Sequence, residues 1–335
     1  MDWWHRIRGV GLLVESAVDE RFVAPTHASP GSFPGFAWIA LMITPSPRCL
    51  WSLVLALGAL VGLTGRGFSQ DSTPPEEPPL VPSETIVLFN GKDLVKGKGL
   101  EPFYTFTRET GHDDPLRVFT VVDNIDGNPA IRISGEGSFG GLITRRTYAN
   151  YRLVAEFRWG ELTWGGRKKA ARDSGILLHC FGPDGGYNKT WHASLECQII
   201  EGGVGDFLAV PGETADGKKF IPRLTADVGF DKDKEPFWKS GGTPQTITSG
   251  RINWFGRDPD WVDELDYRGA RDVESPHPEW TRVEVICDGT TITNIVNGQV
   301  VNKAYDVFPT AGKITFQTEG AEIYFRKIEL HPLAK

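Results

Sequence analysis

The chain has 335 residues, 40% of them hydrophobic, and includes 11 Trp and 19 Phe. This content is ample for a buried core and excludes general disorder. The formal net charge is −7 with both signs interspersed, so the chain lacks the basic surface that nucleic acid requires. We therefore expect no nucleic-acid partner.

The first part of the chain predicts export. Residues 1–41 show no sustained periodicity and are interpreted as an over-extended N-terminus ahead of Met42. Residues 42–70 contain Arg48, an apolar run that ends at Leu63, and then small and polar residues, which is the layout of a signal peptide. The apolar run is too short to cross a bilayer comfortably, so we expect no stable membrane span after signal removal. The predicted location is periplasmic or secreted.

The remaining chain predicts a linker and one domain. Residues 71–83 are rich in Pro and acidic side chains, as in a solvated linker. Residues 84–332 are expected to form a single β-sandwich, because sandwiches often exceed about 200 residues as one unit. This domain keeps Cys180, Cys197 and Cys287, so at most one internal disulfide can form. Whether Cys180 pairs with Cys197 stays open.

From Glu84 onward, short runs of alternating apolar and polar residues are separated by Gly, Asn, Asp or Pro. Alternation of this kind predicts strands, and regular turns between them predict an all-β sandwich or jelly roll. The predicted strands are 85–90, 117–123, 130–134, 151–159, 175–180, 195–200, 281–289, 291–298, 313–318 and 322–330.

The alternation lapses in residues 202–278, which contain Gly, Pro, charged side chains and several aromatics. Two runs in this stretch, 221–228 and 245–255, predict further strands. A loop region of such length in one domain usually binds something or covers a site. The alternative, that it packs its own aromatic side chains, is equally open.

The clearest predicted geometry is an antiparallel hairpin of residues 173–180 and 195–200. Symmetric pairing would place Cys180 opposite Cys197, and one face of the hairpin would then enter the core. The core face would carry Ile176, Leu178, Cys180, Leu195, Cys197 and Ile199. The open face would carry Leu177, His179, Glu196, Gln198 and Ile200.

The open face supplies the candidate functional residues. Glu196, His179 and His192 are the candidate catalytic groups, because a carboxyl or imidazole can transfer protons once its surroundings adjust its pKa. Aromatic rings suit the apolar faces of sugars, and carboxylates and amides suit their hydroxyls. The candidate substrate-binding residues are Glu156, Arg158, Asp173, Trp191, Gln198 and Gln317. An ordinary solvated sheet face is the alternative.

The sequence identifies no particular cofactor. His179 and Glu196 nevertheless offer nitrogen and oxygen ligands of the kind that a divalent metal accepts. A metal site at this pair is therefore a second hypothesis.

Segments throughout the domain resemble the 3-keto-disaccharide hydrolase family. The segments are LFNGKDL at 88–94, residues 140–159, DSGILLHC at 173–180, LECQII at 195–200, residues 278–285, residues 296–304 and residues 314–330. The resemblance implies a concanavalin-like jelly roll related to lectins and glucanases. It also implies activity on glycosides whose sugar carries a 3-keto group. Many relatives have Asn and Arg where this chain has Asp173 and His179, so transfer of the reaction is less direct.

The 3-keto group gives a chemical logic to a simple site. A ketone at C3 acidifies the proton on C2, so a base can remove it and the C1 substituent leaves by elimination, after which water adds. The resemblance assigns Glu196 or His179 as base or metal ligand, with His192 and Gln317 in support. The competing hypotheses are a lectin-like carbohydrate-binding module of the cell envelope and a structural envelope protein. The E-x-D-x-x-E arrangement of ordinary retaining glucanases is absent.

Overall fold

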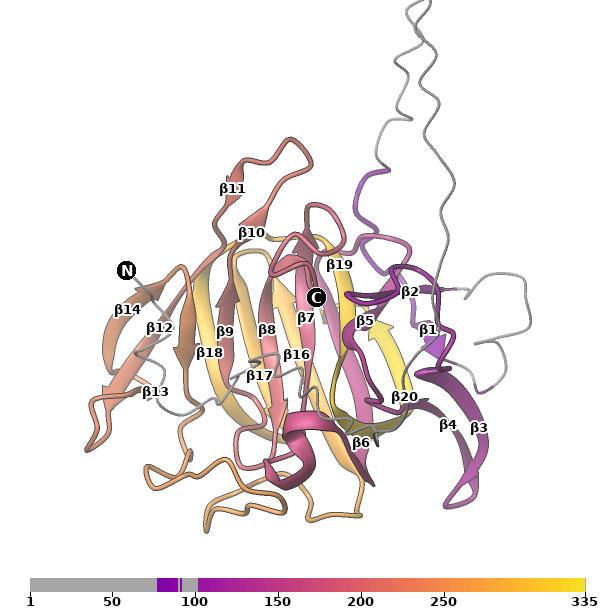
Figure 1. The fold of residues 1–335 in the computed structure, drawn as a ribbon. Coiled ribbons are helices and arrows are strands. Elements are labelled where there is room, and N and C mark those ends of the chain that lie inside the picture. The colour runs from indigo at the N-terminus through magenta and orange to yellow at the C-terminus, as the bar shows by residue number, and fades with distance from the viewer. Residues whose placement is uncertain (1–76, 90, 92–101, 335) are drawn as a thin grey trace, which may run out of the picture. The chain divides into compact units, whose positions relative to one another are not determined.

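The structure is a computed structural model that describes residues 77–89, 91 and 102–334. Two large β-sheets stack in these ranges, with β7, β8, β9 and β19 in front of β16, β17 and β18 (Figure 1). The predicted signal peptide and over-extended start lie outside the described residues. Within the described ranges, no helix is long and apolar enough to cross a membrane.

The rear sheet has eleven strands. Its main path runs through β13 (Pro236–Trp238), β12 (Arg223–Phe230), β18 (Gln299–Phe308), β17 (Thr291–Val296), β16 (Thr281–Asp288), β6 (Tyr151–Thr163), β20 (Ala321–His331), β4 (Asn128–Ile133) and β3 (Phe119–Ile125). Two strands pair off this path, β1 (Ile86–Phe89) with β20 and β14 (Thr243–Ile247) with β12.

The front sheet has seven strands and bears the candidate site. Its order is β15 (Gly250–Ile252), β9 (Phe207–Val210), β8 (Ala193–Ile200), β7 (Asp173–Phe181), β19 (Lys313–Glu319), β5 (Phe139–Thr144) and β2 (Phe103–Thr107). A small hairpin of β10 (Gly212–Glu213) and β11 (Lys219–Phe220) rises at one end, and the 3₁₀ helix η2 spans Gly165–Lys169 (Figure 1).

The core lies between the sheets. Phe316 of the front sheet packs edge-on against Phe325 of the rear sheet, with ring centroids 5.1 Å apart. Phe103 approaches the same Phe316 ring at 6.0 Å. Full burial of one such side chain stabilises the fold by about 1.5–3 kcal/mol. The predicted all-β, concanavalin-like jelly-roll sandwich is confirmed.

The alternating runs all form strands, and the runs at 221–228 and 245–255 also contain strand residues. The strands β2, β5, β9, β10, β11, β13 and β18 were not predicted. In β5, Gly140 and Gly141 interrupt the alternation of apolar and polar residues, and glycine is normally depleted in strands. A Cβ on Gly140 would lie 2.1 Å from the Phe106 carbonyl oxygen. Close approach of β2 therefore requires this glycine.

The predicted hairpin of β7 and β8 exists, but its register is wrong. Cys197 lies opposite Ile176, and Cys180 pairs with Lys313 of β19 instead. The pairing shifts between Leu178 and Phe181, and His179 there has a φ of 52°. In a bulge of this kind, the side chains project from the face of the sheet opposite to the one that regular alternation predicts. The three cysteines are free.

Residues 202–278 are more ordered than expected, since they contain β9 to β15. Trp254 is 1% exposed and donates through Nε1 to the Gly202 carbonyl oxygen, 3.1 Å away. Trp261 donates to the Glu201 carbonyl oxygen at 2.8 Å and also lines a cleft. Some aromatic residues of this stretch are therefore packed in the interior, and others line the cleft.

Candidate active site

A cleft of about 710 Å³ lies on the outer face of the front sheet. Its floor comes from β7, β8, β9 and β19, and its walls come from loops on both sides. Carboxyl and amide side chains of the floor face aromatic and arginine side chains of the walls. The residues used below are Arg108, Phe139, Asp173, Leu177, Tyr187, Trp191, Glu196, Gln198, Leu208, Arg251, Arg257, Trp261, Gln317 and Glu319.

Glu196 occupies the centre of the floor and is 3% exposed. Leu177 pairs with Glu196 across β7 and β8, so alternation correctly placed both on the outer face. Next to them, Gly175 has no side chain. A Cβ on Gly175 would lie 2.2 Å from Oε1 of Glu196 and 2.2 Å from Oε1 of Gln317. The missing side chain therefore leaves a notch in which these two oxygens meet.

Gln317 has an unsatisfied acceptor. Its side chain is 3% exposed, and within the described ranges its Oε1 accepts no hydrogen bond. A buried acceptor without a partner is costly, about 1–3 kcal/mol. A ligand that offers a hydroxyl donor at this point would remove that cost.

A second carboxyl group supports the floor. Asp173 accepts a hydrogen bond from Gln198 Nε2 at 2.8 Å and forms an ion pair with Arg167 of η2. Glu319, 6% exposed, forms a hydrogen bond to Asp173. Burial, followed by the charges of Asp173 and Glu196, raises the pKa of Glu319 well above its usual range. This shift favours the protonated form of Glu319, which is the form that can donate a hydrogen bond to Asp173.

The electrostatics single out Glu196. Burial, and then the charge of Asp173, raise its pKa to about 8, while the positive charge of Arg251 opposes this rise. Desolvation disfavours the charged form of any carboxyl, and a nearby negative charge adds to that effect. A carboxyl with a pKa near the working pH can both take up and release a proton. Glu196 therefore has the property expected of a general acid/base.

The two walls carry aromatic rings. Trp191 stacks near Tyr187 with centroids 6.4 Å apart, and it donates through Nε1 to the Gly140 carbonyl oxygen. On the other wall, the Arg257 guanidinium lies 4.3 Å from the ring centroid of Trp261. Flat rings on both sides suit a ligand with apolar faces, such as a sugar.

Arg251 enters the cleft from β15. It pairs with Leu208 of β9, and Leu208 pairs with Glu196 of β8, so the three residues form one row across the sheet. Asp206, which is fully buried, accepts a hydrogen bond from Arg251 Nη1 at 3.1 Å. It also accepts one from Arg257 Nη1 at 2.9 Å. Asp206 therefore fixes an arginine on the floor and an arginine on the wall.

His192 is outside this cleft. Its Nε2 lies 2.9 Å from Oδ1 of Asp184, and Tyr104 donates to the same oxygen at 2.7 Å. Burial opposes ionisation of Asp184, but the hydrogen bonds from His192 and Tyr104 outweigh it and lower its pKa. This network attaches residues 182–191, which carry Tyr187 and Trp191, to the sheet. The placement of His192 supports an anchoring role for it.

The catalytic prediction for His179 is wrong. The bulge turns its ring into the core, where it packs edge-on against Tyr151 of the rear sheet at 6.1 Å. Its Nδ1 lies 2.8 Å from the Pro309 carbonyl oxygen. The neighbouring Cys180 turns the opposite way, and its Sγ lies 3.4 Å from Oγ1 of Thr315. Cys180 therefore leaves the predicted core face.

The metal hypothesis for His179 and Glu196 fails for the same reason, because the two side chains lie on opposite faces of the front sheet. In the ranges that the structure describes, no group of three or more His, Cys, Asp or Glu side chains is arranged to hold a metal ion.

Glu156 and Arg158 are also misplaced by the prediction. They project from the outer face of the rear sheet, while Leu153 and Phe157 of the same strand enter the core. Glu156 accepts a hydrogen bond from Arg326 at 2.7 Å, and Arg158 donates to Asp126. Both belong to a surface ion-pair network on the far side of the sandwich. They cannot contact a ligand in the cleft.

Five of the predicted site residues line this cleft: Asp173, Trp191, Glu196, Gln198 and Gln317. Glu319 also lines it but was not predicted, although it lies on the same face of its strand as Gln317. Arg251, Arg257 and Trp261 were also missed. They come from the long 202–278 stretch, where no periodicity in the sequence indicates which side chains point to the surface and which to the core.

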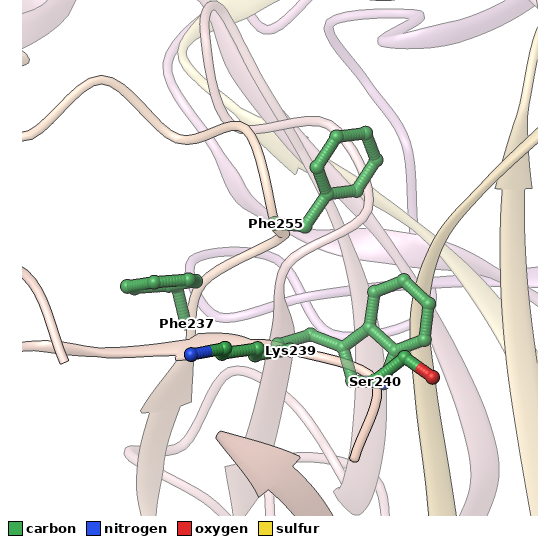
Figure 2. A pocket seen from close by; sticks show the side chains of 5 residues that line it. Phe237, Lys239, Ser240 and Phe255 are labelled. Carbon is green, nitrogen blue, oxygen red and sulfur yellow. The ribbon is translucent and has the colours of Figure 1, made fainter. Parts of the chain in front are cut away.

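A second hollow of about 440 Å³ lies beyond one wall of the cleft. Figure 2 shows Phe237 and Phe255 around it, together with Lys239 and Ser240. Its lining lacks carboxyl groups. Of these two cavities, the cleft is therefore the one lined by carboxyl groups.

Comparison with known proteins places the chain in a family. A family model described as the 3-keto-alpha-glucoside-1,2-lyase-like domain matches residues 84–331. No curated protein matches the chain significantly.

Similar solved structures include a putative glycosyl hydrolase from Parabacteroides distasonis, with 18% identity and a TM-score of 0.41, covering 75% of this chain and 94% of that one. Another is the carbohydrate-binding module CBM66 from Bacillus subtilis, with 12% identity, a TM-score of 0.34, and coverage of 68% and 96%. A third is the Bacillus licheniformis beta-glucanase, with 9% identity, a TM-score of 0.32, and coverage of 64% and 82%. Since the family model spans most of the chain, this protein belongs to the family of 3-keto-alpha-glucoside-1,2-lyase-like domains.

Proposed function

We propose that this protein is an exported enzyme that cleaves glycosides whose sugar has been oxidised to a ketone at C3, with Glu196 as the acid/base group. The observation that carries the proposal is the buried Glu196 carboxyl, whose pKa is raised to about 8 at the centre of an aromatic-walled cleft. Family membership supports the choice of this substrate class.

The proposed reaction is an elimination. The ionised Glu196 removes the proton from C2, and the electrons of the C2–H bond form a double bond between C2 and C3 while the ketone oxygen becomes an enolate. When the ketone re-forms, the C1–O bond breaks and a C1–C2 double bond forms. Glu196 returns its proton to the departing oxygen. Addition of water across the new double bond gives net hydrolysis.

The cleft residues suit this substrate. Tyr187 and Trp191 on one wall and Trp261 on the other offer flat faces to the sugar rings. The orphan Gln317 Oε1 beside Glu196 is an acceptor for a sugar hydroxyl. Asp173, held by Arg167, keeps a negative charge near Glu196 and so strengthens it as a base. No step in this scheme needs a metal ligand from the chain.

Export is part of the proposal and rests on residues 42–70, whose layout is that of a signal peptide. A periplasmic or secreted enzyme would meet extracellular glycosides.

The test is turnover by the purified protein. A methyl 3-keto-glucoside and a 3-keto-disaccharide would be supplied with their unoxidised parents as controls, in parallel with and without a chelator. We expect release of the C1 substituent from the keto compounds alone. Glu196→Gln should bind them and release nothing. Binding without turnover by the unaltered protein would show a lectin-like module and would end the enzyme proposal.

A further inference from the structure

We infer that Arg251 is a catalytic residue that holds the oxygen on which negative charge develops, and that Asp206 is the positioning residue that aims it. This inference rests on the proposed elimination. It adds a group that the acid/base scheme lacks, because Glu196 handles the proton and no group has yet been named for the enolate oxygen.

The first support is the register. Glu196, Leu208 and Arg251 lie in one row on three adjacent strands, with Leu208 between the other two. Neighbouring strands are about 4.8 Å apart, so the Cα atoms of Glu196 and Arg251 are about 10 Å apart. Long polar side chains at that spacing can contact opposite sides of one sugar ring that rests over Leu208.

The second support is preorganisation. Asp206 lies in the turn between β8 and β9 and is fully buried. Besides Arg251 and Arg257, its carboxyl accepts a hydrogen bond from the Trp254 backbone N–H at 2.7 Å. Three contacts fix its orientation, so the Arg251 side chain that it holds is fixed as well. Donors that are already in place when charge develops are the ones that accelerate reactions.

The third support is unused donor capacity. A guanidinium has five N–H donors, and in the described part of the chain only Nη1 of Arg251 has a hydrogen-bond partner. The Arg251 side chain is 17% exposed, and it lines the cleft. Donors therefore remain for a ligand oxygen.

The other arginines of the cleft are less suited. Arg257 has its guanidinium face on Trp261, and its side chain is only 7% exposed. Arg108 donates to Glu109 through both Nε and Nη2. Of the three guanidiniums, Arg251 is the one whose charge acts on both Glu196 and Asp173. This places it within electrostatic reach of the reacting groups.

The proposed elimination proceeds in two stages, and Arg251 acts in both. Glu196 takes the C2 proton, and the C2–H electron pair becomes the C2–C3 double bond. The π electrons of the C3 carbonyl move onto its oxygen, which accepts N–H hydrogen bonds from Arg251. As the carbonyl re-forms, the electron pair on its oxygen returns to the C3–O bond, and the C2–C3 π electrons form a C1–C2 double bond. The C1–O bond breaks with its electrons on the departing oxygen, which receives the proton from Glu196. Arg251 donates hydrogen bonds throughout and loses no proton.

The test compares Arg251→Lys, Arg251→Ala and Asp206→Asn on a 3-keto-glucoside. Removal of one preorganised oxyanion donor lowers kcat about 10²–10³-fold. We expect that loss for Arg251→Ala with KM changed only a few-fold, a smaller loss for Arg251→Lys, and partial recovery of Arg251→Ala by added methylguanidinium. Asp206→Asn should lower kcat while Arg251 is still present. The matched control is Arg282→Ala, which removes a guanidinium bonded to Glu156 and Glu284 on the far face.

The possible failures are distinguishable. If the unaltered protein does not turn over keto-glucosides, the proposed function fails and this inference with it. If it does, but Arg251→Lys and Arg251→Ala keep kcat within a few-fold, Arg251 only ties β15 to the turn and the inference alone is overturned. Loss of activity in Arg251→Ala that methylguanidinium does not restore, with Arg251→Lys folded and fully active, would overturn it too. Thermal melting of each variant reports folding separately.

Discussion

The Oε1 atoms of Glu196 and Gln317 meet in the same notch of the front sheet, each 2.2 Å from the point that a Cβ on residue 175 would occupy. One oxygen belongs to a carboxyl that is protonated below a pH of about 8. The other is the oxygen of an amide, and within the described residues it accepts no hydrogen bond. The floor of the cleft therefore combines an acid/base group and an acceptor in the space that one glycine leaves.

Gly175→Ala should abolish most activity with little loss of stability. Cβ atoms essentially never come within 3.0 Å of other heavy atoms, so both side chains must move away from a methyl group. They can do so, because the contacts are at their flexible ends. A displacement of about 1 Å at a reacting group costs about 10²-fold in rate. We expect kcat/KM on a 3-keto-glucoside to fall about that much, with the Tm changed by a few degrees.

The control for this prediction is Gly166→Ala, because a Cβ on Gly166 of η2 would meet nothing within 4 Å. That variant should keep both activity and Tm. Full activity in Gly175→Ala would show that neither Glu196 nor Gln317 needs its observed position.

The rate should rise with pH through the pKa of Glu196. Burial and the Asp173 charge raise that pKa to about 8, and the base form of a carboxyl is the ionised form. Below that pH the log of kcat/KM for a 3-keto-glucoside should increase by about one unit for each unit of pH. A pH–rate profile measures this rise. In Glu196→Gln, kcat/KM should fall at least about 10³-fold and should no longer rise with pH. A rate that falls as pH rises through 8 would contradict the base role.

Much of the fold could be predicted from alternation. In β6, Leu153 and Phe157 face the core, as alternation along a strand requires. Alternation says which face of a strand a residue occupies but does not say which of the two sheets the strand joins. Glu156 and Arg158 were therefore assigned to the polar face of the wrong sheet.

The site could be predicted only where strands stay regular. Glu196 and Gln198 lie in an uninterrupted part of β8, and their facing was correct. His179 lies in the bulge of β7, where a φ of 52° reverses the parity, and no property of the surrounding residues reveals that dihedral. Arg251 was unpredictable for a different reason, since its position depends on long-range pairing of β15 with β9.

Asp184→Asn should weaken substrate binding more than catalysis. The Asp184 carboxyl holds the loop that carries Tyr187 and Trp191, through His192 at 2.9 Å and Tyr104 at 2.7 Å. An amide would weaken the charge-assisted contacts, which are about twice as strong as neutral ones. We expect KM for a 3-keto-glucoside to rise about tenfold with kcat nearly unchanged.

The comparison variant for this prediction is Asp216→Asn. Asp216 pairs with Lys218 at the exposed tip of the β10–β11 hairpin and does not line the cleft. Its replacement should change neither parameter. An equal fall of kcat and kcat/KM in Asp184→Asn would instead mean that Asp184 stabilises the transition state of the reaction.

His179 should make the fold sensitive to mild acid. Burial lowers its pKa to about 4, which the hydrogen bond to the Pro309 carbonyl oxygen only partly offsets, whereas an unfolded histidine titrates near its ordinary value of 6.5. As pH falls from about 6.5 to about 4, the unfolded chain therefore binds a proton that the folded chain does not. The free energy of unfolding should decrease over this window by about 3 kcal/mol from this residue, and no further below it.

Denaturant unfolding at a series of pH values measures this effect. His179→Asn is the informative variant, because asparagine tolerates a φ of 52° and does not titrate. We expect it to be less stable at neutral pH but to lose less stability between pH 6.5 and 4. His331→Gln removes an imidazole from the rear sheet, where Nε2 lies 2.9 Å from Glu329, and it should keep the slope that His179 causes. An unchanged slope in His179→Asn would mean that the pKa of His179 is the same in the folded and unfolded chain, so that burial does not lower it.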